Sequence, residues 1–141
     1  MKTLPEANIR LYGEPSTAGP PELTIWPSHK IDELPPDRFD LVLNQDSMPE
    51  MSRQIVDDYL DWIGRSCSGA FVSINHESNV SYGDQLAHVR VSDAALPLDT
   101  FELEERYPYW LRKGYTVEIY RVGDAARRHE TQRLSSGAAA S

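Results

Sequence analysis

The chain has 141 residues, 40% of them hydrophobic, so it is long enough and apolar enough to form the core of one ordinary domain. Its formal net charge of −8 at pH 7 argues against non-specific binding of nucleic acid, because no basic stripe could displace counterions from phosphates. No apolar stretch approaches the roughly 18 residues of a membrane span, and the amino terminus lacks the apolar core of a signal peptide. We therefore expect no membrane partner and a cytoplasmic protein. The single cysteine, Cys67, can form no internal disulfide, which fits a reduced compartment and a structural role.

Two short extended stretches are predicted at residues 9–12 and 23–26, separated by a loop rich in glycine and proline. Pro35 and Pro36 then exclude a regular helix and turn the chain into a longer apolar run.

A strand, a helix and a second strand are predicted next. The run at residues 39–43, interrupted only by Asp40, has the length and branched character of a strand buried on both faces, and residues 70–74 form a second run. Between them Ser52 can cap a helix in which apolar residues recur at helical spacing: Ile55, Val56, Tyr59, Leu60 and Ile63. Such a βαβ unit makes the two strands parallel.

Polar triplets end both of these strands. Asn44-Gln45-Asp46 follows the first strand and Asn75-His76-Glu77 the second. Because parallel strands end at the same edge of a sheet, both triplets should lie at one edge, where open α/β sheets bind their ligands.

The rest of the chain contains one further predicted strand. Residues 78–99 mix polar residues with Leu86, Val89 and Val91 and are interpreted as a lid or a substrate-facing excursion. Residues 115–122 alternate between apolar and polar side chains, which predicts a late strand, such as a member of an antiparallel hairpin. Residues after 123 lack an apolar period. We therefore expect a folded portion over residues 1–123 and a disordered tail over residues 124–141.

Three segments of the chain resemble a known family: residues 40–51, Ser73-Ile74-Asn75, and the segment from Tyr109 to Tyr115. They are similar to the carboxyl half of the sugar O-methyltransferases, which are Rossmann-like enzymes that depend on S-adenosylmethionine. The resemblance covers roughly residues 8–122. It implies an α/β fold with a partial Rossmann-like methyltransferase sheet, made of the parallel βαβ unit and a late strand or hairpin.

The glycine-rich half of such an enzyme has no counterpart in the sequence. The eight glycines stand at 13, 19, 64, 69, 83, 114, 123 and 137, so no pair has the close spacing of a G-x-G turn. In the family's sheet order the strand at 39–44 lies between two others, and here one neighbour is missing. We therefore expect either a fragment of a longer enzyme or a chain that pairs with a partner, including a second copy, through the open edge of strand 39–44.

The resemblance also implies roles for the first triplet. Asn44, Gln45 and Asp46 would lie beside the methionine end of the cofactor. The alternative is turn chemistry, because Asn and Asp side chains often bond the backbone where a strand ends.

Methyl transfer to a hydroxyl requires a base, and His76 is the first candidate because histidine titrates near neutral pH; Asp46 is the competing base. Asn75, Glu77 and Glu50 are candidates for binding sugar hydroxyls. A solvated loop histidine and a carboxylate that complements a helix dipole are the alternatives for His76 and Glu50.

Tyr109 and Trp110 could stack on a sugar ring, although ordinary packing would also explain two adjacent aromatic residues. His76, Glu77 and His88 lack the spacing of a metal site, so no metal is expected. A hydrolase is a weaker alternative because no serine stands in a G-x-S-x-G setting. The main alternative to a methyltransferase is a non-catalytic remnant or partner subunit that retains the acceptor half of the fold.

Overall fold

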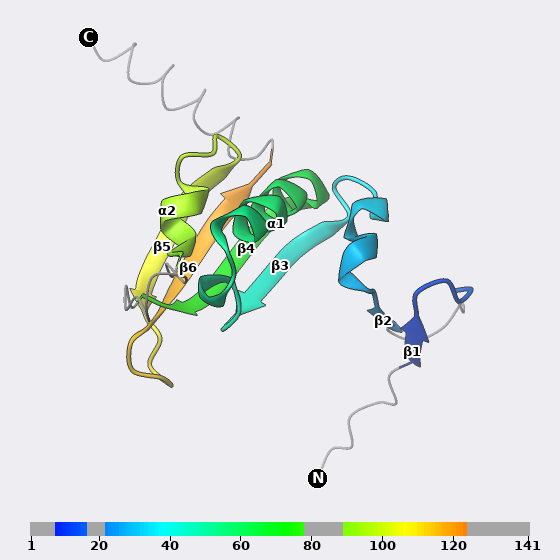
Figure 1. Cartoon of the computed structure of the whole chain (residues 1–141), viewed down its shortest axis with the longest axis horizontal. Helices are drawn as coiled ribbons and strands as arrows, with labels where there is room; N and C mark the ends of the chain where they lie inside the picture. Colours follow the sequence, from blue (N-terminus) through cyan, green and yellow to red (C-terminus); the bar gives the residue numbers. More distant parts are fainter. Residues whose placement is uncertain (1–7, 17–21, 78–88, 124–141) are drawn as a thin grey trace. The chain divides into compact units, whose positions relative to one another are not determined.

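The computed structural model describes residues 8–16, 22–77 and 89–123. By their contacts the residues divide into two compact units, Met1–Leu34 and Pro35–Ser141, which are described separately here (Figure 1). The predicted tail at residues 124–141, and residues 78–88 of the predicted excursion, lie outside the described residues.

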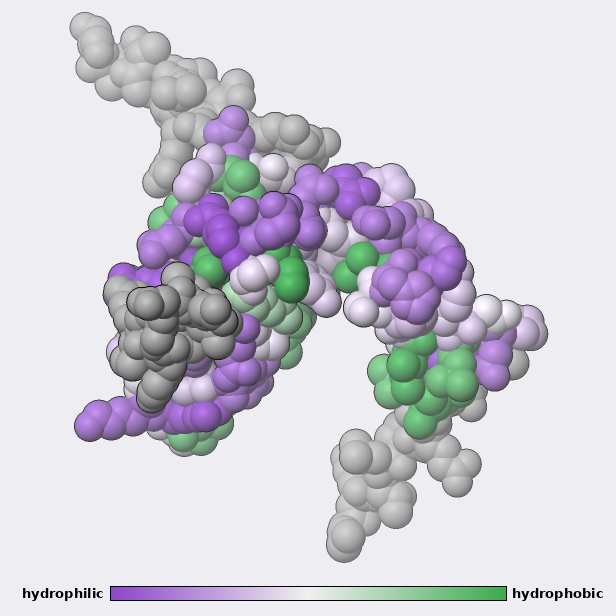
Figure 2. All heavy atoms as spheres, in the orientation of Figure 1, coloured by the Kyte–Doolittle hydropathy of each residue, from purple (hydrophilic) through white to green (hydrophobic). Residues whose placement is uncertain are grey.

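The first unit contains a two-stranded parallel sheet. Strand β1 (Asn8–Leu11) pairs with β2 (Glu22–Ile25), which confirms the two extended stretches, and a 3-10 helix η1 (Ser28–Glu33) follows. One face of the pair carries aliphatic side chains that are each more than half exposed: Ile9, Leu11, Leu23 and Ile25. Figure 2 shows these strands as a hydrophobic area of the surface.

The second unit begins with the predicted βαβ unit. Strand β3 (Phe39–Gln45), the short 3-10 helix η2 (Met48–Glu50), helix α1 (Arg53–Ser66) and strand β4 (Cys67–His76) follow one another, and β3 pairs with β4 in parallel. The Ser52 side chain caps α1 by accepting a hydrogen bond from the Ile55 amide at 3.4 Å. The parallel pairing and the helix between the strands are therefore confirmed.

An antiparallel hairpin completes the sheet of this unit. Helix α2 (Val91–Ala95) leads to β5 (Phe101–Pro108), which pairs with β6 (Tyr115–Val122), and β6 also pairs antiparallel with β4. The strand order is β3-β4-β6-β5. The predicted late strand is β6, and its membership of an antiparallel hairpin is confirmed. The sequence analysis did not predict the other strand of this hairpin, β5, or the helix α2.

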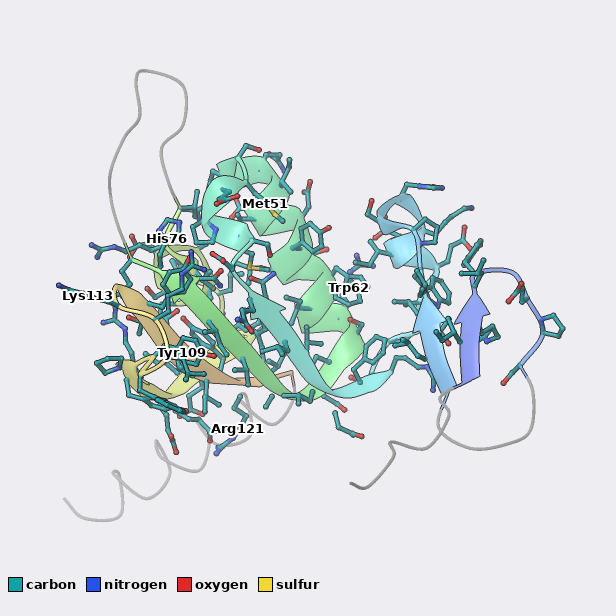
Figure 3. The ribbon with its side chains drawn as sticks, turned by 90° about the horizontal axis from the view of Figure 1, so that it is seen from below. Met51, Trp62, His76, Tyr109, Lys113 and Arg121 are labelled. Carbon is teal, nitrogen blue, oxygen red and sulfur yellow. The ribbon has the colours of Figure 1, made fainter. Side chains whose placement is uncertain are left out.

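One hydrophobic core lies between the sheet and the helices. Its rings stack at the centre, with Phe71 and Tyr120 at 5.7 Å between centroids and Phe101 edge-on to both. Residues from α1, α2 and η2 join the same cluster, including Met48, Val56, Leu60, Ile63, Val91, Ala94 and Ala95. The described helices of this unit therefore pack on one face of the sheet, as Figures 1 and 3 show.

Strand β3 is not buried on both faces, so that prediction is wrong. Val42 packs against the core under α1, but Leu41 and Leu43 on the opposite face are each 59% exposed. β3 also lies at the edge of the described sheet, with β4 as its neighbour. Apolar periodicity identified the strand correctly, but a strand needs a layer on each side to be buried twice, and the described elements supply one layer.

Close backbone contact fixes the start of β4 against β3. The pairing shifts register between Phe39 and Leu41, and a Cβ placed on Gly69 would lie 2.1 Å from the Asp40 carbonyl oxygen. Only glycine fits there.

Cys67, directly before this bulge, is a buried free thiol whose pKa is raised by burial, in agreement with a structural role.

Among the described helices, none has both the length and the apolar character needed to cross a membrane.

Candidate functional site

Both polar triplets lie at one edge of the sheet of the second unit, as predicted. β3 and β4 run parallel with Asn44 opposite Ser73 and Gln45 opposite Ile74, and the Asp46 amide donates to the Ile74 carbonyl at 3.0 Å. The two strands thus end side by side, and residues 44–46 and 75–77 meet there.

The β5–β6 hairpin brings a third polar segment to the same edge. Because β6 is antiparallel to β4, it begins where β4 ends, with Tyr115 paired to His76. The hairpin turn, residues 109–114, is closed by the Tyr109 amide donating to the Tyr115 carbonyl at 2.8 Å. Gly114 has a φ of +86° in this turn, a conformation that favours glycine. Figure 3 shows Lys113, which belongs to this turn, at the same end of the sheet as His76.

Asn75 is a buried hydrogen-bond hub rather than an open ligand group. Its Nδ2 donates to Asn44 Oδ1 at 3.1 Å and to Ser73 Oγ at 2.9 Å, and its Oδ1 accepts from the Ser47 amide at 3.2 Å. Asn44 in turn donates from Nδ2 to Ser47 Oγ at 2.6 Å. These hydrogen bonds of the Asn44 side chain thus go to side chains and not to the backbone, and the pair of asparagines holds the chain after β3 in place.

Asp46 is held by two side chains of the β5–β6 hairpin. Its backbone has a φ of +56°, and its carboxylate accepts hydrogen bonds from the Tyr115 hydroxyl and from Nη1 of Arg112. The Arg112 guanidinium also lies over the Tyr115 ring, 4.2 Å from its centroid. The Tyr115 hydrogen bond and then Arg112 lower the pKa of Asp46, with a smaller contribution from His76. A carboxylate held in this way is a weak base.

His76 lies next to this pair and is half-buried. Its ring meets the Tyr115 ring edge-on, with 5.8 Å between centroids. Burial and the hydrogen bond to Asp46 both raise the pKa of Tyr115, so this residue remains a neutral hydroxyl donor. The structure therefore brings both predicted bases, His76 and Asp46, into contact with one tyrosine, Tyr115.

A second polar cluster lies behind His76. Arg106 of β5 pairs with Glu77 and, through Nε, with Glu118 Oε1 at 3.2 Å, and Glu118 is buried and accepts from the Tyr120 hydroxyl at 2.8 Å. A small pocket with room for about one water molecule adjoins the cluster. Its lining includes His76, Glu77, Arg90, Ser92, Thr116 and Glu118.

Of the other predicted site residues, Gln45, Glu50 and Trp110 are exposed. Gln45 lies on the face of β3 that also carries Leu43, and Glu50 ends η2, before the cap of α1 and outside its first turn, so it does not complement that helix dipole. Trp110 is 84% exposed at the hairpin turn and Tyr109 is half-buried, so ordinary packing does not explain Trp110.

Sequence reasoning missed several residues at the edge. Arg112, Tyr115, Ser47 and Arg106 complete the hydrogen bonds and ion pairs of the predicted residues. The signal was available for Arg112 and Tyr115, since they belong to the late segment that supported the family resemblance.

In the part of the chain that the structure describes, no three His, Cys, Asp or Glu side chains are grouped to hold a metal ion, and His88 lies outside it.

The solved structures that are similar to this chain include the following two. The PH0226 protein from Pyrococcus horikoshii OT3 superposes with a TM-score of 0.56 at 15% identity over 72% of this chain. A candidate type 11 methyltransferase from Sulfolobus solfataricus gives a TM-score of 0.53 at 17% identity over 71% of this chain. The fold is Rossmann-like, of the kind found in methyltransferases.

The match includes only part of each neighbouring structure. This chain covers 59% of the length of each. No protein-family model matches the sequence, and neither does any curated protein.

Proposed function

We propose that this chain forms the acceptor-side part of an S-adenosylmethionine-dependent O-methyltransferase that acts on a sugar or glycoconjugate. The observation that carries the proposal is the convergence of three polar segments, residues 44–47, 75–77 and 109–115, at the edge where the parallel strands end. The fold shared with the two neighbours supports methyl transfer as the reaction class, and the sequence resemblance supports the sugar acceptor.

The residues at the edge fit one end of the cofactor. S-adenosylmethionine supplies an electrophilic methyl group on a sulfonium. Asp46 presents a partly exposed carboxylate whose lowered pKa keeps it ionised, which suits the ammonium of the methionine part. Gln45 adds an exposed amide beside it. Among the residues that the structure describes, no closely spaced glycines form a turn for the nucleotide.

His76 is the better base of the two candidates. Asp46 is committed to Arg112 and Tyr115, so protonating it would break a charge-assisted pair. An imidazole is the most common general base in proteins, and His76 stands one position past the buried Asn75, at the end of β4. It would accept the proton of the acceptor hydroxyl as the oxygen attacks the methyl carbon in line.

The hairpin turn supplies the acceptor platform. Trp110 offers an exposed ring on which the C–H face of a sugar can pack, with Tyr109 adjacent. Glu50 and Glu77 are charged acceptors for sugar hydroxyls near the same edge, and Asn75 serves by holding the edge in shape. The single thiol, buried and unpaired, supports a reduced, cytoplasmic setting for the reaction.

A specific observation favours the second candidate, a non-catalytic partner subunit. The wide spacing of the eight glycines leaves this sequence without the glycine-rich turn that lets a backbone approach the cofactor closely in Rossmann-like folds. Such a subunit would keep the acceptor edge and its hairpin and obtain the nucleotide-binding half from another polypeptide.

Calorimetric titration of the full chain with S-adenosylhomocysteine separates the two candidates. Heat with saturation below about 1 mM, equivalent to about −4 kcal/mol, supports a cofactor site in this chain, and its absence leaves the partner subunit. A second assay follows labelled methyl groups from S-adenosylmethionine into a panel of monosaccharides and glycans. The His76→Gln variant should lose about 10²–10⁴-fold in transfer rate while it still binds cofactor. Equal rates for the two forms would rule out His76 as the base.

A further inference from the structure

The strand at the edge of the second unit has an open side. β3 pairs with β4 on one side, and no other strand in the described residues pairs with it. Along this edge Leu41 and Leu43 are each 59% exposed, and the strand contains one charged residue, Asp40, and neither lysine nor proline. Edge strands that are protected against pairing usually carry lysine, proline or several charges. β3 lacks this protection, so its open side can accept another strand.

The helix side of the same edge is also apolar and incompletely covered. Ile55, Tyr59 and Trp62 follow one another at helical spacing along α1, Ile55 is 45% exposed, and the other two are half-buried. Trp62 lies 6.1 Å from Phe39 between ring centroids, which places this stripe next to the edge strand. Aliphatic and aromatic surface thus flanks the open strand on both faces of the sheet.

We propose that a second copy of this chain binds here, with the two β3 strands antiparallel about a two-fold axis. The two four-stranded sheets then form one continuous sheet, and the α1 stripes of both copies meet across the junction. An isologous contact of this kind is the commonest form of association between identical chains.

Hydrogen-bond geometry restricts the register of the pair. The Asp46 amide points to β4, so along the regular β3 strand the even-numbered residues turn their backbone groups inward and the odd-numbered residues turn theirs to the open side. An antiparallel partner must therefore bond to residues 39, 41, 43 and 45. Registers that pair odd with even residues are excluded.

Among the allowed registers, the one centred on Val42 places apolar side chains opposite apolar side chains. Leu41 of each copy then lies opposite Leu43 of the other, which gathers four leucines on the uncovered face. Val42 meets its own copy as the closely spaced pair without hydrogen bonds. Asp40 of each copy lies opposite Asn44 of the other, and Phe39 lies opposite Gln45. These contacts oppose no like charges, although each chain carries a net charge of −8.

Multi-angle light scattering of the full chain tests the proposal directly. We expect a dimer at micromolar concentration, and the Leu43→Lys variant should raise the dimer dissociation constant at least tenfold because it places a charge in the leucine cluster. Leu96→Lys is the matched control, since Leu96 is 51% exposed at the end of α2 and belongs to no strand of the sheet. A monomeric wild-type chain at about 100 μM, or a dimer that Leu43→Lys leaves intact, would overturn the proposal.

Cysteine cross-linking tests the register independently. In the proposed pair the two Val42 Cα atoms are about 4.5 Å apart, within the range that a disulfide spans. Val42→Cys, in a Cys67→Ser background, should form a covalent dimer on mild oxidation, and Leu43→Cys in the same background should form far less. The reverse order, or equal yields, would contradict the register centred on Val42.

Discussion

Arg112 and Asp46 form an ion pair across 66 positions of the sequence, and this pair ties the β5–β6 hairpin to the end of β3. Tyr115 adds a hydrogen bond to the same carboxylate, so two groups from one hairpin hold one strand end. Pairing between β4 and β6 already fixes the hairpin beside the second triplet, and this contact fixes its turn to the first triplet as well.

The lowered pKa of Asp46 makes a pH-dependent contribution to stability. A carboxylate with a folded-state pKa below its unfolded value, about 3.9, stabilises the fold above that pH, and the contribution is lost as pH falls through the folded pKa. In Arg112→Gln and Tyr115→Phe the pKa of Asp46 should rise toward its ordinary value. NMR titration of the carboxyl carbon measures it. Arg53→Gln, which removes the exposed ion pair with Asp57, should leave the Asp46 titration unchanged.

The buried hub at Asn75 should matter for stability. Replacing Asn75 with alanine removes partners from Asn44, Ser73 and the Ser47 amide, and leaving buried polar groups unsatisfied costs about 1–3 kcal/mol. Chemical denaturation should show that loss in the free energy of unfolding. Gln45→Ala, at an exposed position one residue from Asn44, should change it by less than about 0.5 kcal/mol. Similar values for the two variants would refute the role of Asn75 as a hub.

Gly69→Ala should destabilise the fold by about 1–3 kcal/mol or more, because the new Cβ would collide with the Asp40 carbonyl in a backbone that cannot move away easily. Gly64→Ala in α1 provides the comparison. There the new Cβ would lie 3.0 Å from Thr100 Cγ2, a side chain that can rotate, and alanine gains about 1 kcal/mol in helix propensity. Thermal and urea unfolding of both variants should therefore give a clear loss for Gly69 and little net change for Gly64.

The sequence predicts the parts of this fold that local patterns determine. The helical spacing of Ile55, Leu60 and Ile63, with Ser52 as cap, defines α1, and the parallel order of β3 and β4 follows from it. The sequence could not predict that Leu41 and Leu43 are exposed, because the burial of a strand face depends on whether another layer of the structure packs on it. β5 was missed because four of its eight residues are charged, and their ion-pair partners lie on β6 and directly after β4. The Asp46–Arg112 pair is likewise a product of topology, since only the hairpin brings those residues together.

Trp110 should contribute to acceptor binding and not to folding. A tryptophan that is 84% exposed buries little surface, so Trp110→Ala should leave the free energy of unfolding within about 0.5 kcal/mol of the parent chain. If the ring is the sugar platform, the same variant should raise the acceptor KM several-fold while kcat changes little, since the ring binds the ground state and the transition state alike. Trp62→Ala is the contrasting variant, because Trp62 packs against Phe39 beside the core and its removal should lower stability. An unchanged acceptor KM in Trp110→Ala would exclude the hairpin turn from the acceptor site.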